Sequence, residues 1–148
     1  MINFLKKKEE NINNNSDFLS KVASLLIHAA KIDEVYTDDE KEIIKKTLIK
    51  LGAKNSNINE IISKATINEE NSNQILDFTR EVKNTSESDK IKIIKALWEI
   101  IYSNNNADMY ETNLMRRLAG LLYINNKLMG DIKEKIKKKF QNDLSGKW

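Results

Sequence analysis

Five carboxylates lie between residues 33 and 40 with no basic side chain among them. They are Asp33, Glu34, Asp38, Asp39 and Glu40. Grouped carboxylate oxygens are the ligands that Ca²⁺ and Mg²⁺ prefer, so the first candidate chemistry is divalent-cation binding. The spacing differs from that of an EF-hand loop, which alternates its ligands around a central glycine. The pattern therefore indicates a weak or partner-completed cation site.

The same acidic turn also has a purely structural explanation. Thr37 and Glu40 stand three residues apart, which is the spacing of a capping box at the start of a helix. Carboxylates in a first helical turn are favoured by the positive end of the helix dipole, which accounts for Asp38 and Asp39. We favour the helix start as the main role of these residues and keep the cation site as the alternative.

A looser copy of this order occurs at residues 102–124. A polar run follows Tyr102, Asp108 and Glu111 stand three residues apart, and an apolar run begins at Leu114. An apolar helix, a polar turn and a capped helix therefore occur twice, at residues 17–51 and 87–123. The repeat predicts an internal two-fold duplication in which the two apolar helices pack side by side.

Other residue types with catalytic potential are few. His28 is the only histidine, it lies within an apolar run, and it is best explained as a core or boundary side chain. The chain contains no glycine-rich phosphate loop and no Gly-x-Ser-x-Gly motif. We therefore predict no enzymatic activity and no catalytic residue. Trp98 and nearby tyrosines are most simply core and boundary aromatics, although they could also line a ligand groove.

The C-terminal part of the chain is basic. Residues 127–148 hold seven lysines against three acids, whereas the formal charge of the whole chain is +3. Five of these lysines lie close together and could contact phosphate groups of nucleic acid or of an anionic membrane surface. They are Lys133, Lys135, Lys137, Lys138 and Lys139. The alternative explanation is a solvated lysine face that suits the C-terminal end of a helix.

Composition predicts one all-α domain. The chain has 148 residues, no proline and four glycines, so it lacks the turn residues of a strand-rich fold. We expect a single bundle of about seven helices, with residues 1–15 as a flexible lead-in, residues 16–140 as the domain and residues 141–148 as a tail. The apolar spacing predicts helices at about residues 17–32, 38–51, 56–65, 73–82, 87–102, 109–123 and 127–140.

Cysteine is absent, and the first residues place their charges after a very short apolar stretch. Both features differ from those of secreted proteins, which carry disulfides and signal peptides. No segment reaches the roughly 18 apolar residues of a membrane span. We therefore expect a cytoplasmic protein.

Four separated motifs occur in order along the chain. They are Ala30-Lys31-Ile32-Asp33-Glu34, Thr37-Asp38-Asp39-Glu40, Leu97-Trp98-Glu99-Ile100-Ile101-Tyr102 and Glu111-x-x-Leu114-x-Arg116-Arg117-Leu118-Ala119. Together they resemble the tellurite-resistance TerB-like family, which also includes the N-terminal region of a DnaJ-like membrane co-chaperone. The resemblance covers about residues 17–140. It implies an all-α bundle of about seven helices with an internal duplication.

The resemblance also implies site residues and a role. Acids in the two turns of the family have been proposed to bind metal, and by position Asp33, Glu40 and Glu111 correspond to them. Glu34 stands where the family usually has glycine, and the second turn has asparagines in place of Asp-Gly. We therefore expect a non-enzymatic interaction or stress-response module with a protein partner and no cofactor beyond weakly bound Ca²⁺ or Mg²⁺. The alternative is a phosphate-binding module that acts through the lysine-rich C-terminal helix.

Overall fold

The protein is all-α. The computed structural model describes residues 17–32, 36–72, 74–103 and 107–145, and it describes side chains for all of these except residues 107–112 and 141–145. This part of the chain contains seven helices and no strand, as predicted. The first helix spans residues 17–30, and it is followed by α2 (Asp38–Lys50), α3 (Ile58–Asn71), α4 (Leu76–Val82), α5 (Glu87–Tyr102), α6 (Ala107–Leu121) and α7 (Asn126–Ser145).

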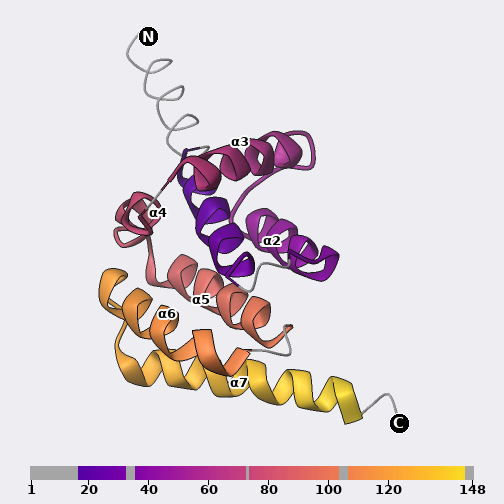
Figure 1. Ribbon diagram of the computed structural model, residues 1–148, viewed down its shortest axis with the longest axis vertical. Coiled ribbons are helices and arrows are strands. Elements are labelled where there is room, and N and C mark those ends of the chain that lie inside the picture. The colour runs from indigo at the N-terminus through magenta and orange to yellow at the C-terminus, as the bar shows by residue number, and fades with distance from the viewer. Residues whose placement is uncertain (1–16, 33–35, 73, 104–106, 146–148) are drawn as a thin grey trace, which may run out of the picture.

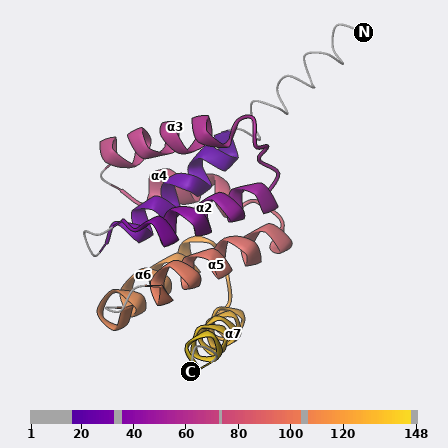
Figure 2. The same cartoon turned by 90° about the vertical axis from the view of Figure 1, so that its right-hand side faces the viewer.

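The helices are stacked in layers, with α3 at one end and α7 at the other. Figures 1 and 2 both place the first helix and α2 between α3 and α5. α5 packs against α2 on one side and against α6 and α7 on the other. α4 contacts α6, so it also connects the two ends of the stack. None of the helices in the described residues combines the length and the apolar character that crossing a bilayer requires.

One hydrophobic core joins these layers. The largest fully buried side chains come from the first helix, α2, α5, α6 and the residue directly after α6. They are Leu19, Leu25, Leu26, Ile27, Ile44, Leu48, Ile93, Ile94, Leu97, Ile100, Leu118 and Leu122. Each such side chain contributes about 1.5–3 kcal/mol by leaving water. α5 is buried on most of its circumference because it packs between two layers.

The predicted capping box at the start of α2 is confirmed, and two further helix ends have well-defined capping geometry. At the start of α2, Glu40 N donates to Thr37 Oγ1 at 3.2 Å and Thr37 N donates to Glu40 Oε1 at 2.9 Å, which completes the capping box. Gly52 after α2 has φ 116°, and the neighbouring Ala53 N donates to Leu48 O at 2.9 Å. This geometry is the left-handed helix end that glycine favours. Ser86 Oγ accepts from the backbone N–H of Asp89 at the start of α5.

Other helix ends differ from the predictions. The polar stretch after residue 68 was expected to be a linker, but α3 continues to Asn71. Glu69 on this extra turn contacts Lys31 of the segment after the first helix, and tertiary contact of this kind can override a weak local pattern. Asn125 was expected to end the sixth helix, whereas its Oδ1 accepts from Leu128 N at 2.7 Å and so caps α7. α6 ends at Leu121, and α7 runs through residue 140 to Ser145.

The predicted internal duplication stays a prediction. The first helix contacts α3, for example where Ser24 Oγ donates to Ala65 O at 3.1 Å. α5, which is its predicted counterpart, packs against α2, α6 and α7. The side-by-side packing of the two apolar helices is likewise untested, although Leu26 and Trp98 belong to the same hydrophobic cluster.

Candidate functional site

The predicted acidic turn divides into buried and exposed carboxylates. Asp38 and Asp39 are exposed on the first turn of α2, whereas Glu40 is only 2 % exposed. Asp33 and Glu34 lie outside the described residues, and the side chain of Glu111 does too. The cation site that would join the two turns therefore stays a prediction.

The Glu40 carboxylate takes part in starting α2. Its Oε1 accepts from both the backbone N–H and the hydroxyl of Thr37, each at 2.9 Å. Tyr36 lies beside it, and burial together with the Glu40 charge raises the pKa of the Tyr36 hydroxyl. Lys41 Nζ lies 5.2 Å from the centre of the Tyr36 ring and 3.8 Å from Asp38 Oδ1. These contacts define how the chain enters α2.

The predicted basic cluster is not a uniform surface. Lys135, Lys137, Lys138 and Lys139 are exposed on α7. Lys133 is half-buried instead, with its Nζ 5.6 Å from the centre of the Trp98 ring on α5. Lys133 therefore belongs to the contact between α5 and α7, and the other four lysines form the solvent-facing part.

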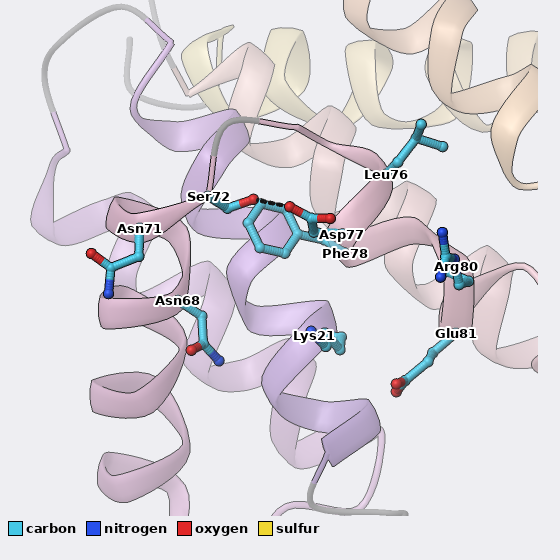
Figure 3. Close-up of a pocket in the computed structure, with 9 residues that line it drawn as sticks. All are labelled: Lys21, Asn68, Asn71, Ser72, Leu76, Asp77, Phe78, Arg80 and Glu81. Carbon is cyan, nitrogen blue, oxygen red and sulfur yellow. Dashed lines mark hydrogen bonds between the residues drawn. The ribbon is translucent and has the colours of Figure 1, made fainter.

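A polar pocket of about 380 Å³ lies where the first helix, the end of α3 and α4 meet. Figure 3 shows its side chains around Phe78, with Lys21 from the first helix facing the side of α4 that carries Glu81. Asn68 and Asn71 come from α3, and Ser72 donates a hydrogen bond to Asp77. Arg80 and Leu76 complete the α4 side of the pocket.

Carboxylates meet at one edge of this pocket. Asp17 and Lys21 of the first helix both lie close enough to Glu81 to act on its carboxyl. Burial, the Asp17 hydrogen bond and the Asp17 charge raise the pKa of Glu81, while Lys21 opposes the rise. The pocket thus offers ammonium, guanidinium, amide and carboxyl groups together. Such a set suits recognition of a polar ligand more than bond-making chemistry.

Sequence reasoning missed this pocket. Its charged residues come from two helices that are separated by 45 residues, 31–75, so no local motif joins them. The available signals were Asp17 and Lys21 four residues apart on the first helix, together with Asp77, Arg80 and Glu81 on α4. Only the packing of the first helix against α4 brings these two groups together.

The boundary position predicted for His28 is confirmed. Its side chain is 39 % exposed, and its Nδ1 lies 3.4 Å from Glu69 Oε1. Lys31 Nζ approaches the other oxygen of the same carboxylate at 2.8 Å. Glu69 thereby ties the C-terminal end of the first helix to α3. Across the described residues, no three His, Asp or Glu side chains lie close enough together to hold a metal ion.

The family model for tellurite resistance protein TerB matches residues 19–134. The chain belongs to the TerB family. The matched region runs from the first helix into α7, so it includes the acidic turn, the polar pocket and the core. The resemblance predicted from the two turns is therefore confirmed, whereas the relation to a DnaJ-like co-chaperone stays a prediction. Comparisons with curated proteins and with solved structures gave no significant match.

Proposed function

We propose that this TerB-family protein is a non-enzymatic helical module that acts by binding another protein, in the cytoplasm and as part of a stress response. The observation that carries the proposal is the polar pocket between the first helix, α3 and α4. Its lysine, arginine and asparagine side chains are groups that recognise a partner through hydrogen bonds and charge.

A cross-linking capture tests this proposal. The full chain is used as bait in lysate of the cells that produce it, and a pocket variant, Asn71→Arg with Arg80→Glu, is compared with it. The matched control is Asn55→Arg with Lys45→Glu, which makes the same charge changes at exposed positions outside the pocket. We expect the wild type and the control to capture the same protein and the pocket variant to lose it. Capture that is equal for all three chains would contradict the proposed role of the pocket.

The proposal includes weak divalent-cation binding at the acidic turn. Asp38 and Asp39 are exposed and therefore accessible to an ion, whereas Glu40 is already hydrogen-bonded within the capping box. Because cation affinity depends on the number of available carboxylate ligands, the exposed pair supports weak binding only. The ion would then be Ca²⁺ or Mg²⁺ at millimolar concentration.

A second candidate function is binding of phosphate groups through α7. The observation that favours it is the exposure of Lys135, Lys137, Lys138 and Lys139, which make no ion pair with another described residue. Four exposed lysines in one short stretch can attract anionic lipid or nucleic acid, and salt should weaken that attraction.

A further inference from the structure

The charged side chains of the polar pocket are accessible. Asp77, Arg80 and Glu81 of α4 are exposed, and Lys21 of the first helix is half-buried. The ion pairs of the described residues all lie elsewhere and involve none of these four groups. Figure 3 shows Lys21 and Glu81 on facing sides of the pocket. The charges of the pocket are therefore available to a ligand.

Carboxylates outnumber cations around this pocket. Asp77 and Glu81 line it, and Asp17 lies close to Glu81 at its edge. The cations are Lys21 and Arg80. Three negative charges against two positive ones give a net charge of −1 when all five groups are ionised. Charge complementarity therefore favours a ligand that brings positive charge.

Glu81 shows the same shortage of positive charge. Burial and then the proximity of Asp17 raise the pKa of its carboxyl, and the opposing effect of Lys21 is smaller. A raised carboxyl pKa means that the surroundings disfavour the charged form. A further cation held within about 4–6 Å would favour the ionised carboxylate. Glu81 is therefore the side chain that gains most from a positively charged ligand.

The rest of the lining indicates which cation fits. Leu76 is 42 % exposed on the α4 side of the pocket, so it offers apolar surface to an aliphatic stem. Asn68 and Asn71 of α3 present side-chain amides, whose oxygens can accept hydrogen bonds. A guanidinium has five N–H donors in a planar fork and can pair with a carboxylate through two of them. Arginine therefore matches this lining better than lysine.

We propose that the polar pocket receives an arginine side chain of the partner protein. Its guanidinium pairs with the carboxylates of Glu81 and Asp17, and its stem packs on Leu76. Arg80 repels the bound charge and so limits the affinity. The proposal rests on the proposed function, and it names the chemistry by which the pocket recognises its partner.

Peptide titration followed by NMR tests this proposal. The isotope-labelled full chain is titrated with the acetylated and amidated peptide Gly-Ala-Arg-Ala-Gly, and the side-chain amide signals of Asn68 and Asn71 report on the pocket. A second peptide has citrulline, which keeps the shape of arginine without its charge, and a third has Glu at that position. We expect saturable shifts with the Arg peptide and an affinity for the citrulline peptide that is about tenfold weaker. The Glu peptide should bind more weakly still.

Two variants with matched controls locate the binding. Glu81→Gln should weaken binding of the Arg peptide about tenfold, whereas Glu60→Gln, at an exposed position of α3 outside the pocket, should leave it unchanged. Asp17→Asn should also weaken binding, and Asp131→Asn, at an exposed position of α7, should not. Circular dichroism checks that each variant keeps its helices.

Arg80 provides a prediction of opposite sign. Because Arg80 repels a bound cation, Arg80→Gln should strengthen binding of the Arg peptide about two- to fivefold at low salt. Arg117→Gln removes an exposed charge from α6 and should have no effect. A pocket that binds acidic ligands through its cations would show the reverse, with Arg80→Gln weakening binding of the Glu peptide.

Several outcomes would overturn the proposal. Equal affinities for the Arg and citrulline peptides would remove the charge argument, and tighter binding of the Glu peptide would make the pocket a site for acidic ligands. Absence of saturable shifts with the Arg peptide would also contradict it.

Capture from lysate separates this proposal from the proposed function. Asn71→Arg, in the pocket variant described above, supplies a guanidinium of the chain itself that competes for the same carboxylates. If that pocket variant loses the partner and Glu81→Gln keeps it, the arginine proposal fails while the proposed function stands. If the pocket variant keeps the partner as well, the proposed role of the pocket fails.

Discussion

Glu40 illustrates how a single side chain can fit two different sequence patterns. Its position among five carboxylates indicates a cation ligand, and its spacing from Thr37 indicates a capping box. Burial and two hydrogen bonds to Thr37 agree with the second interpretation. A carboxylate committed to a helix start offers less of its charge to an ion, which is why we expect only weak cation binding at this turn.

The capping role predicts a calcium-independent loss of stability. Thr37→Ala removes the acceptor for Glu40 N and one donor to its carboxylate, so we expect about 1 kcal/mol of unfolding free energy to be lost. Ser86→Ala, which removes the corresponding cap of α5, should cost a similar amount. Urea denaturation with calcium and with chelator measures both. A loss for Thr37→Ala that occurs only with calcium would contradict this explanation.

The cation proposal gives a separate prediction for Asp33. With weak binding, Ca²⁺ at micromolar concentration should leave the melting temperature unchanged, and Asp33→Asn should be nearly silent. Asp39→Asn is a comparison at an exposed position of the same turn. A calcium titration that shows micromolar affinity, abolished by Asp33→Asn, would instead establish a tight site.

Glu81 predicts a pH-dependent change in stability. Its pKa is raised in the folded protein by burial and by Asp17, so its stabilising contribution is complete below pH about 4.5 and is lost as pH rises through the folded pKa. The stability of the Glu81→Gln variant relative to the wild type should therefore be higher at pH 7 than at pH 4. Denaturation at both pH values measures the difference. In an Asp17→Asn background the difference should shrink, because one of its causes is removed, and an undiminished difference would exclude Asp17 as a cause.

At the scale of whole helices, the sequence predicted where a helix begins more accurately than where it ends. The Thr37–Glu40 capping box acts through neighbours in the chain, so local spacing was enough to predict the start of α2. The extra turn of α3 could not be predicted in this way, since Glu69 contacts a residue that is 38 positions earlier in the chain. The polar pocket depends on the same kind of long-range packing, and for that reason no motif revealed it.

Tyr123 shows a related limit at the end of α6. The helix ends with φ 56° at this residue, a left-handed conformation in which glycine is the usual choice. Its ring is 75 % exposed and lies with its centre 5.8 Å from Lys83 Nζ. The apolar spacing predicted a helix to about residue 123, whereas α6 ends at Leu121. Because a tyrosine rarely adopts the left-handed conformation, local sequence gave no sign of this earlier end.

The two helical glycines give a prediction about α6 and α7. A Cβ at either Gly120 or Gly130 would meet no atom within 4 Å, so alanine should fit at both positions. We expect Gly130→Ala, inside α7, to raise the unfolding free energy by about 0.5–1 kcal/mol. The Gly120→Ala variant should gain less unfolding free energy, because position 120 lies next to the end of α6. Thermal and urea unfolding measure both changes, and a loss of stability for Gly130→Ala would show that the backbone there needs glycine.

For the molecule as a whole, charge is distributed unevenly along the stack of helices. Asp38 and Asp39 are exposed on the first turn of α2 in the middle of the stack, and the exposed lysines lie on α7 at one end, as Figures 1 and 2 show for the helices. The net charge of +3 therefore says little about what any one face can bind. Protein binding at the polar pocket and phosphate binding at the α7 lysines would use different parts of the stack, so variants can separate them.

Replacing three lysines on α7 separates the two functions. Lys137→Gln, Lys138→Gln and Lys139→Gln remove three exposed charges from α7, and Lys45→Gln, Lys46→Gln and Lys50→Gln remove three exposed charges from α2. If α7 binds phosphate groups, the α7 set should reduce retention on phosphatidylserine vesicles by about tenfold or more at low salt, because each lysine near the membrane adds about 1 kcal/mol of surface attraction. The α2 set should then have little effect. If the module binds only protein, the wild type should show no salt-sensitive vesicle retention. Capture of the protein partner should then persist in both triple variants, since neither changes a residue that lines the polar pocket.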